Sequence, residues 1–379
     1  MREKKIPKKI LFLTGTRADF GKIKPLLQAV ENEDGFQNFV FVTGMHLQHT
    51  YGYTLFEIER CGFNNLHTFD NQTHETTMDL TLAKTIEGLS VYVKKIRPDI
   101  IVIHGDRVET LAGAIVGSLN NILVAHIEGG ELSGTVDELI RHSVSKLSHI
   151  HFVSNTQAQK RLQQMGELPS SIYVIGSPDL DVMFSKHLPD LQTVRAYYEI
   201  PFDAFALVLF HPVTTEAAQM QAYADAFVEA LMKDTHHYVV VYPNNDLGSK
   251  AILKAYGSLK NHPRFRVFPS LRFEYFLTLL KNAQFIIGNS SAGIREAPAY
   301  GIPVINIGTR QQNRDLQADI LNVDYTAENI FEALQNIGKH PVSPPSNHFG
   351  NGNSAKLFLS CLKNDDIWQI NHQKQFRDY

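Results

Sequence analysis

The sequence predicts an α/β protein made of two doubly wound, Rossmann-like domains. Short apolar runs of strand length alternate with longer segments of helical period along the whole chain of 379 residues. These runs are apolar throughout, which is typical of parallel strands that are covered on both faces. The same rhythm occurs in each half of the chain, and the length is sufficient for two separate cores.

The expected strands fall at similar intervals in the two halves. In the first half they are Lys9–Thr14, Phe39–Thr43, Asp99–His104, Ile122–His126, His149–Val153 and Ile172–Ile175. In the second half they are Ala206–His211, Tyr238–Tyr242, Phe265–Phe268, Phe285–Ile287, Pro303–Ile307 and Ile320–Val323. A helix is expected between the second and third strands, where apolar residues recur at helical spacing: Met78, Leu82, Ile86, Leu89 and Val93.

The pattern loosens within Asp179–Phe205, so we expect the boundary between the domains there. This gives an N-terminal domain of residues 1–185, a C-terminal domain of residues 186–350, and a last helix and tail of residues 351–379. The segment Pro341–Gly352 is rich in Pro, Ser, Asn and Gly, which indicates a loop. The helical segment Ser354–Leu362 could fold onto either domain.

Composition excludes several classes of protein. The formal charge of -3 leaves no overall basic footprint for nucleic acid, and two cysteines argue against a disulfide framework. No apolar run approaches the length of a spanning helix, so we expect a soluble, cytoplasmic protein with no membrane partner. The histidines form neither an HExxH motif nor a His/Cys pair at zinc spacing, so no metal is expected.

Acidic residues follow two neighbouring strands and open the next helix. They are Asp106 in Gly105-Asp106-Arg107, Glu128 in Glu128-Gly129-Gly130-Glu131, and Asp137 in Asp137-Glu138. Ligands of open α/β sheets bind beyond the carboxyl ends of the strands, so these acids are expected to converge on one site. The alternative is that Asp106 and Asp137 cap the helices that follow them.

Two turns have the composition of anion sites. The first, Thr14–Lys22, precedes an expected helix at Ile23–Val30, and its Arg17 and Lys22 could contact phosphate. The second, Gly288–Ala297, offers N–H and hydroxyl donors, with Glu296 placed to accept from a ribose. The alternatives are an ordinary turn with solvated cations at the first and a helix cap at the second.

Three further strand ends carry polar residues. His46 ends Thr43-Gly44-Met45-His46, His211 lies in Phe210-His211-Pro212, and Asn244 lies in Tyr242-Pro243-Asn244-Asn245-Asp246. A histidine at the end of a strand can either contact a ligand or serve a structural role, and the sequence leaves both open.

Taken in order, these motifs resemble those of the UDP-N-acetylglucosamine 2-epimerases over nearly the whole chain. The resemblance rests on Gly15–Asp19 with Gly21, Thr43–His46, Gly105–Arg107, His126–Glu131, Asp137-Glu138 with Arg141-His142, Phe210–Pro212, Tyr242–Asp246 and Gly288–Ser291. It implies a GT-B-like fold, in which the two domains face each other across a cleft that holds the nucleotide sugar. It also implies a homodimer or homotetramer and a reaction that needs no cofactor.

The resemblance assigns roles residue by residue. It implies that Asp106, Glu128 and Asp137 are the catalytic carboxylates and that His211 approaches the diphosphate. Substrate or nucleotide contacts are expected at Arg17, Lys22, His46, Arg107, Asn244, Gly288, Asn289, Ser290, Ser291, Gly293 and Glu296. We favour Asp106 as the base at C2, with Glu128 and Asp137 sharing the hydration step.

The chain is more similar to the hydrolysing branch, which makes N-acetylmannosamine for sialic acid-type sugars. Non-hydrolysing relatives carry Glu-Ala-Gly followed by Leu-Arg where this chain has Glu128-Gly129-Gly130-Glu131. Alternative substrates are GDP-N-acetylglucosamine and a UDP-linked 2,4-diacetamido-2,4,6-trideoxyhexose. A GT-B glycosyltransferase and a non-catalytic sugar-nucleotide sensor are the alternatives outside this chemistry.

Overall fold

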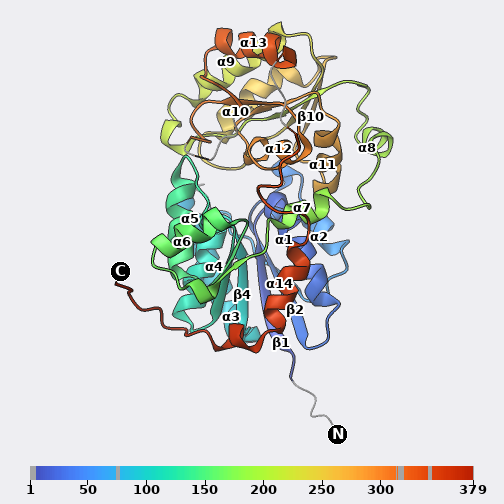
Figure 1. Cartoon of the computed structure of the whole chain (residues 1–379). Coiled ribbons are helices and arrows are strands. Elements are labelled where there is room, and N and C mark those ends of the chain that lie inside the picture. Colours follow the sequence, from blue (N-terminus) through green and yellow to red (C-terminus); the bar gives the residue numbers. More distant parts are fainter. Residues whose placement is uncertain (1–5, 74–76, 313, 315–319, 340–343, 379) are drawn as a thin grey trace. The chain divides into compact units, whose positions relative to one another are not determined.

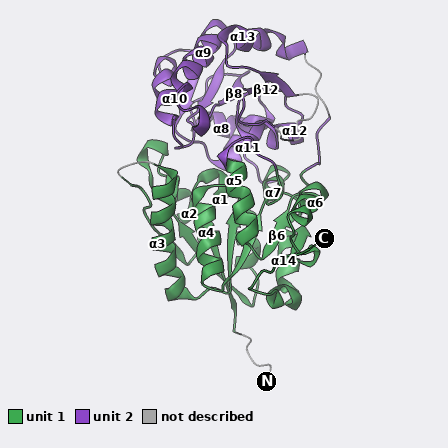
Figure 2. Ribbon diagram, turned by 90° about the vertical axis from the view of Figure 1, so that its left-hand side faces the viewer, with its two compact units in different colours: residues 1–131, 137–185, 349–379 green, residues 132–136, 186–348 purple. Residues whose placement is uncertain are grey.

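The computed structural model describes residues 6–73, 77–312, 314, 320–339 and 344–378. It divides the chain into two compact units (Figure 2). Unit 1 comprises residues 1–131, 137–185 and 349–379, and unit 2 comprises residues 132–136 and 186–348. Helices flank the sheet of each unit, as Figure 1 shows. No described helix is long and apolar enough to cross a membrane.

Unit 1 contains a seven-stranded parallel sheet in the order β3-β2-β1-β4-β5-β6-β7. Its strands are β1 (Lys8–Thr14), β2 (Phe36–Val42), β3 (Leu66–Thr68), β4 (Ile100–His104), β5 (Leu123–Ile127), β6 (Ile150–Val153) and β7 (Ile172–Val174). Its helices are α1 (Arg17–Glu31), α2 (Leu55–Glu59), α3 (Met78–Ile96), α4 (Val108–Leu119), α5 (Val136–Leu147), α6 (Thr156–Gln164), α7 (Pro178–Met183) and α14 (Ser354–Lys363).

Unit 2 contains a six-stranded parallel sheet in the order β10-β9-β8-β11-β12-β13. Its strands are β8 (Ala206–Leu209), β9 (Tyr238–Val241), β10 (Phe265–Phe268), β11 (Ile286–Gly288), β12 (Val304–Ile307) and β13 (Ile320–Val323). Its helices are α8 (Leu191–Tyr197), α9 (Met220–Lys233), α10 (Ser249–Ala255), α11 (Phe273–Lys281), α12 (Glu296–Tyr300) and α13 (Ala327–Asn336).

Both strand orders are those of a doubly wound fold, so the predicted fold class is confirmed. In each sheet the order reverses at one point, between β1 and β4 in unit 1 and between β8 and β11 in unit 2. Ligands of such sheets bind beyond the strand ends at this reversal. The ends of these four strands are therefore where the site residues must be sought.

Two sequence predictions were wrong in detail. The short edge strand β3 was missed, because Leu66-His67-Thr68 is only three residues long and only partly buried. The first helix begins at Arg17 and not at Ile23, because Thr16 and Asp19 form a capping box that starts it earlier. The predicted stripe on α3 is correct, although only Leu89 and Val93 of its members are fully buried.

The last helix, α14, packs in unit 1. Asp181 on α7 accepts hydrogen bonds from the backbone N–H groups of Ser354 and Ala355 at 2.8 and 2.7 Å, and Phe358 lies in the core of unit 1. Residues 344–353 form neither helix nor strand, whereas residues 340–343 of the predicted loop lie outside the described residues.

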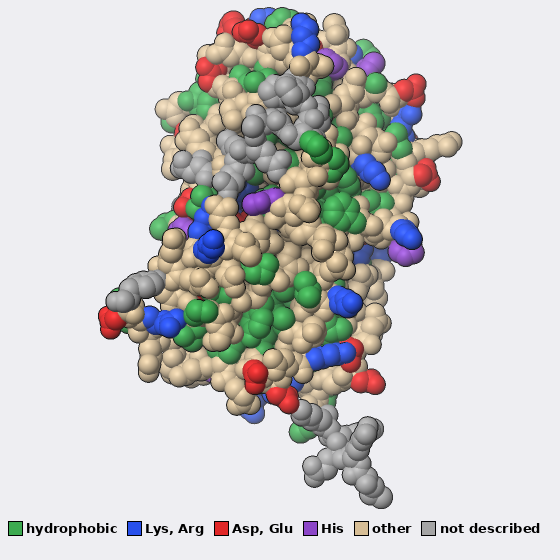
Figure 3. Space-filling model, in the orientation of Figure 1, with side chains coloured by type: hydrophobic (Ala, Val, Ile, Leu, Met, Phe, Trp, Pro, Cys, Tyr) green, Lys and Arg blue, Asp and Glu red, His purple; other side chains and the backbone are tan. Residues whose placement is uncertain are grey.

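On the face shown in Figure 3, acidic and basic side chains are interspersed.

Candidate functional site

Helix α5 brings the predicted acids of unit 1 into one arrangement. Asp106 and Glu128 follow the neighbouring strands β4 and β5, which are paired up to their last residues. Arg141 on α5 donates from one guanidinium nitrogen to the Glu128 carbonyl at 2.7 Å and from the other to the Asp106 carboxylate. Asp137 lies in the first turn of the same helix, four residues before Arg141, and therefore on the same face.

The alternative role of Asp106, as the cap of the helix that follows it, does not apply. Arg107 is the N-cap residue of α4, with no side-chain cap, while the Asp106 carboxylate pairs with Arg141. Asp137 does lie in a helical first turn, where the helix dipole favours a negative charge. Its position is compatible with both the structural and the catalytic alternatives.

Glu128 is the most constrained of the three acids. Its side chain is buried and its φ of 68° lies in the left-handed region, which is uncommon for a residue other than glycine. Its Oε1 accepts from Lys22 Nζ at 3.2 Å and from Ser177 Oγ at 3.1 Å. An unfavourable backbone conformation that the surroundings enforce is typical of functional sites.

Lys22 lies among carboxylates. Its side chain is buried, and Nζ lies 3.2 Å from Glu128 Oε1 and 3.6 Å from Asp179 Oδ2. Sequence reasoning missed Asp179 and Ser177, which follow β7 at the same edge of the sheet. The signal that could have identified them is Ser177-Pro178-Asp179, a polar group directly after an apolar run, as at the other strand ends.

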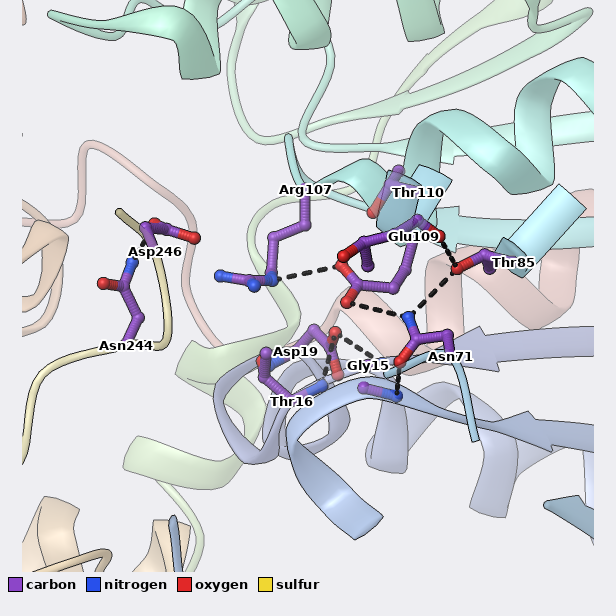
Figure 4. Close-up of polar contacts among 12 residues, drawn as sticks. Gly15, Thr16, Asp19, Asn71, Thr85, Arg107, Glu109, Thr110, Asn244 and Asp246 are labelled. Carbon is purple, nitrogen blue, oxygen red and sulfur yellow. Dashed lines mark hydrogen bonds and ion pairs between the residues drawn. The ribbon is translucent and has the colours of Figure 1, made fainter. Parts of the chain in front are cut away.

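In the turn after β1, the backbone N–H groups are bonded to a carboxylate of the same segment, that of Asp19. Asp19 Oδ2 accepts from the backbone N–H groups of Gly15 and Thr16 at 3.0 and 3.1 Å, and burial raises the pKa of Asp19 (Figure 4). These are the N–H groups that a phosphate at this turn would use. Arg17, the first residue of α1, remains the candidate for a cationic contact with phosphate at this end of the helix.

A second buried acid, Glu109, lies beside this turn. Arg107 Nε donates to Glu109 Oε2 at 3.3 Å, and Asn71 Nδ2 lies 3.5 Å from Oε1 (Figure 4). A Cβ atom at Gly15 would lie 3.0 Å from the Glu109 side chain, so glycine allows this close approach. Arg107, a predicted substrate contact, is thus oriented by Glu109.

Two histidines of unit 1 are buried and neutral. Both ring nitrogens of His46 are hydrogen-bonded, to Thr14 Oγ1 at 2.9 Å and Thr54 Oγ1 at 2.8 Å, and burial lowers its pKa to about 3. His126 is bonded to the Gly105 carbonyl at 2.8 Å and to Ser145 Oγ at 3.1 Å, and burial lowers its pKa to about 3. These contacts give His46 the structural role that the sequence left open, and they link His126 to the Asp106 loop.

In unit 2, His211 and Asn289 join the two strand ends at the reversal of the sheet. The His211 N–H donates to Asn289 Oδ1 at 2.6 Å, and Asn289 Nδ2 donates back to the His211 carbonyl at 2.8 Å. The backbone N–H of Asn244 donates to His211 Nδ1 at 3.0 Å. Nδ1 is therefore an acceptor, so the neutral ring carries its proton on Nε2 and presents a donor there.

The predicted turn after β11 combines close packing with capping. Gly288 has a φ of 138°, and a Cβ there would lie 2.0 Å from the Leu209 carbonyl oxygen, so only glycine fits. Ser290 caps the short 3₁₀ turn Ser291–Gly293 by accepting from the N–H of Ala292. Ser290 caps the turn through its hydroxyl oxygen as an acceptor, so its O–H group can still donate to a ligand. The structural role is therefore compatible with ligand binding.

The remaining candidates of unit 2 follow β11 and β9. Glu296 is the buried first residue of α12, and a Cβ at Gly293 would lie 3.0 Å from Val304. Asn244 Nδ2 donates to Asp246 Oδ2 at 2.5 Å. Among the described residues of both units, no group of three or more His, Cys, Asp or Glu side chains could hold a metal ion.

Comparison with known proteins identifies the family. The family model described as UDP-N-acetylglucosamine 2-epimerase matches residues 28–363. The chain belongs to the UDP-N-acetylglucosamine 2-epimerase family. The resemblance inferred from the ordered motifs is therefore confirmed.

Relatives within the UDP-N-acetylglucosamine 2-epimerase family match nearly the whole chain. A UDP-N-acetylglucosamine 2-epimerase of Neisseria meningitidis serogroup B is 49% identical over 98% of this chain and 99% of its own. A UDP-N,N'-diacetylbacillosamine 2-epimerase (hydrolyzing) of Legionella pneumophila is 32% identical over 94% of this chain and 96% of its own. The crystal structure of a Neisseria meningitidis UDP-GlcNAc 2-epimerase bound to UDP-GlcNAc has the same fold, with a TM-score of 0.78 at 20% identity over 94% of this chain and 100% of that one.

Proposed function

We propose that this protein is a hydrolysing UDP-N-acetylglucosamine 2-epimerase, which converts UDP-N-acetylglucosamine and water to N-acetylmannosamine and UDP. The observation that carries the proposal is the arrangement around Arg141. This one guanidinium holds the Asp106 carboxylate and the Glu128 backbone, on the helix whose first turn carries Asp137. Several carboxylates that converge on one site suit a reaction whose difficult steps are proton transfers.

The first stage of the proposed reaction is an elimination. The C2–H bond of the sugar breaks as the C1–O bond to UDP breaks, and 2-acetamidoglucal remains. Asp106 is our candidate for the base, because its pairing with Arg141 favours the carboxylate form that accepts a proton. Negative side chains near the anomeric carbon also stabilise the positive charge that develops there.

The second stage is hydration of the double bond. Oxygen of water bonds to C1, and a proton is delivered to C2 on the face opposite to the one from which it left, which gives the manno configuration. A base for the water and an acid for C2 are both required, so two carboxyl groups in different protonation states are needed. We assign these tasks jointly to Glu128 and Asp137. Both stages balance without an oxidant or reductant.

UDP is assigned to unit 2. His211 offers Nε2–H to the diphosphate, because Asn244 occupies Nδ1. The turn that includes Gly288, Asn289, Ser290, Ser291 and Gly293 supplies small residues and hydroxyl groups at the end of β11. Glu296 is our candidate for contact with the ribose hydroxyls.

A second substrate is favoured by one finding. The Legionella relative, 32% identical, is named as a hydrolysing epimerase of UDP-N,N'-diacetylbacillosamine. The same elimination and hydration would apply to this sugar, since the reacting atoms C1 and C2 are unchanged. Both substrates therefore belong in the first assay.

The test is proton NMR of the purified protein with each nucleotide sugar in heavy water. UDP-N-acetylglucosamine is expected to give free N-acetylmannosamine that carries deuterium at C2, together with UDP, and UDP-N,N'-diacetylbacillosamine would give its own free 2-epimer and UDP. Asp106→Asn should abolish both reactions, whereas Asp203→Asn, which changes a carboxylate that is 96% exposed, should not. UDP-N-acetylmannosamine without release of UDP would assign the chain to the non-hydrolysing branch. Sugar transfer to an added acceptor would indicate a glycosyltransferase, and no turnover of either sugar would overturn the proposal.

A further inference from the structure

His104, the last residue of β4, lies directly beside the catalytic candidate Glu128. Its side chain is only 7% exposed, and Nε2 lies 3.2 Å from Glu128 Oε1. This is close enough for a strong electrostatic contact, yet Nε2 forms no aligned hydrogen bond to any described residue. A buried ring nitrogen without such a bond, next to a carboxylate in a site, requires an explanation.

The charges around His104 give a reason for a proton at this place. Lys22 is positive, whereas Glu128 and Asp179, which both contact its Nζ, are negative, and all three side chains are less than 10% exposed. Taken by themselves, these three side chains carry one net negative charge, which attracts a proton to this place. One further proton on the group would balance it.

Three further titratable groups lie around the contact of His104 with Glu128. They are Asp19 on α1, His126 on β5 and Arg141 on α5. His126 has both ring nitrogens in hydrogen bonds, and Arg141 is balanced by Asp106. Asp19 accepts hydrogen bonds from Gly15 and Thr16, and it also interacts electrostatically with His104.

We propose that His104 and Glu128 hold one proton between Nε2 and Oε1, and that Asp179 positions Lys22 so that Lys22 and Ser177 fix Oε1 in this contact. Transfer of the proton breaks the Nε2–H bond and forms an Oε1–H bond, which leaves neutral imidazole and a carboxylic acid. The reverse transfer restores imidazolium and carboxylate. No other reactant is needed.

The use of this proton in catalysis rests on the proposed function. As a carboxylate, Glu128 accepts the proton that water loses when its oxygen bonds to C1. As a carboxylic acid, it can donate a proton during hydration. His104 therefore gives Glu128 access to both states at one pH, which a lone buried carboxyl group lacks.

The decisive experiment titrates His104 in the ligand-free protein by NMR of its ring Cε1–H group, assigned by its loss in His104→Gln. Glu128→Gln and Asp179→Asn each remove a negative charge, so each should lower the midpoint of His104 by about one pH unit. Lys22→Met removes a positive charge and should raise it. Asp181→Asn, on the same helix as Asp179, is the matched control, because Asp181 bonds to Ser354 and Ala355. An unchanged midpoint in Glu128→Gln and Asp179→Asn would overturn the proposal.

Kinetics give a second readout. His104→Gln should lower kcat by about 100-fold with little change in KM. In the dependence of kcat on pH, His104→Gln should also move the acidic limb to higher pH, because Glu128 loses a cationic neighbour. Asp179→Asn should move this limb to lower pH. General damage to the fold would not shift the limb in opposite directions, so shifts in the same direction would contradict the proposal. If the wild type forms no product, the proposed function fails, while the titration still decides the state of the pair.

Discussion

The contact of Arg141 with Asp106 and Glu128 gives the most direct test of the site in unit 1. The guanidinium is buried, with a side-chain exposure of 2%, whereas the Asp106 side chain is 22% exposed. Arg141→Met leaves the Asp106 carboxylate without this partner and the Glu128 carbonyl without its 2.7 Å donor. Removal of one partner of a buried pair lowers stability by about 3–5 kcal/mol. The partial exposure of Asp106 places our expectation at the lower end, about 3 kcal/mol.

The assay uses the single tryptophan of the chain, Trp368, which belongs to unit 1. Its fluorescence during urea unfolding reports the free energy of unfolding of this unit. Lys363→Met is the control, since the ion pair of Lys363 with Glu33 is half exposed and should contribute less than about 1 kcal/mol.

A double-mutant cycle then isolates the pair. In Asp106→Asn combined with Arg141→Met, both charges are absent. The double mutant should therefore lose at least about 1 kcal/mol less unfolding free energy than the sum of the two single mutants. Losses that add within about 0.5 kcal/mol would refute the argument that the two side chains act as a pair. Arg141→Lys should also lower kcat, because an ammonium cannot reach both acceptors as the planar guanidinium does.

Three further predictions concern the scaffold and unit 2. His46 and His126 have pKa values of about 3 in the folded protein, below the unfolded value of about 6.5, so the unfolded chain binds more protons between these limits. Their contribution to stability should be complete above about pH 6.5 and should be lost as the pH falls towards 3. Urea unfolding at several pH values measures this change. A free energy of unfolding that stays constant from pH 6.5 to 4 would contradict the prediction. Gly288→Ala should abolish UDP binding or prevent unit 2 from folding, because its Cβ would lie 2.0 Å from a backbone oxygen of β8. Gly257→Ala is its control, since a Cβ there meets no atom within 4 Å. His211→Phe should weaken UDP binding, measured by calorimetry, by about 1–3 kcal/mol through loss of a hydrogen bond to a charged group, and unchanged affinity would exclude the Nε2–H contact.

Much of the fold could be predicted because its signals are local. Apolar runs such as Ile100–His104 and Leu123–Ile127 are buried along their whole length, and this uniform pattern distinguishes parallel strands from surface ones. Polar residues directly after these runs could be assigned to the site, since all strands of a parallel sheet end at the same edge. The strand β3 was missed because a short, partly exposed edge strand has no such pattern.

The placement of individual side chains depended on contacts between residues far apart in the chain. Nothing local indicates that Lys22 pairs with Glu128 and Asp179, since these contacts join α1, the end of β5 and α7. The same holds for His104, which by its sequence is simply the last residue of a strand. The attachment of α14 to unit 1 also depends on a distant residue, Asp181.

The sequence by itself therefore determined the class of fold with its two α/β domains and the family, and it predicted which strand ends carry the site. Only the tertiary structure decided which acids are paired, that His46 is buried with both ring nitrogens bonded, and that His104 lies against Glu128. The physical reason is the range of the interactions. Periodicity and turn chemistry act between neighbours in the chain, whereas charge pairing and burial act between residues that only folding brings together.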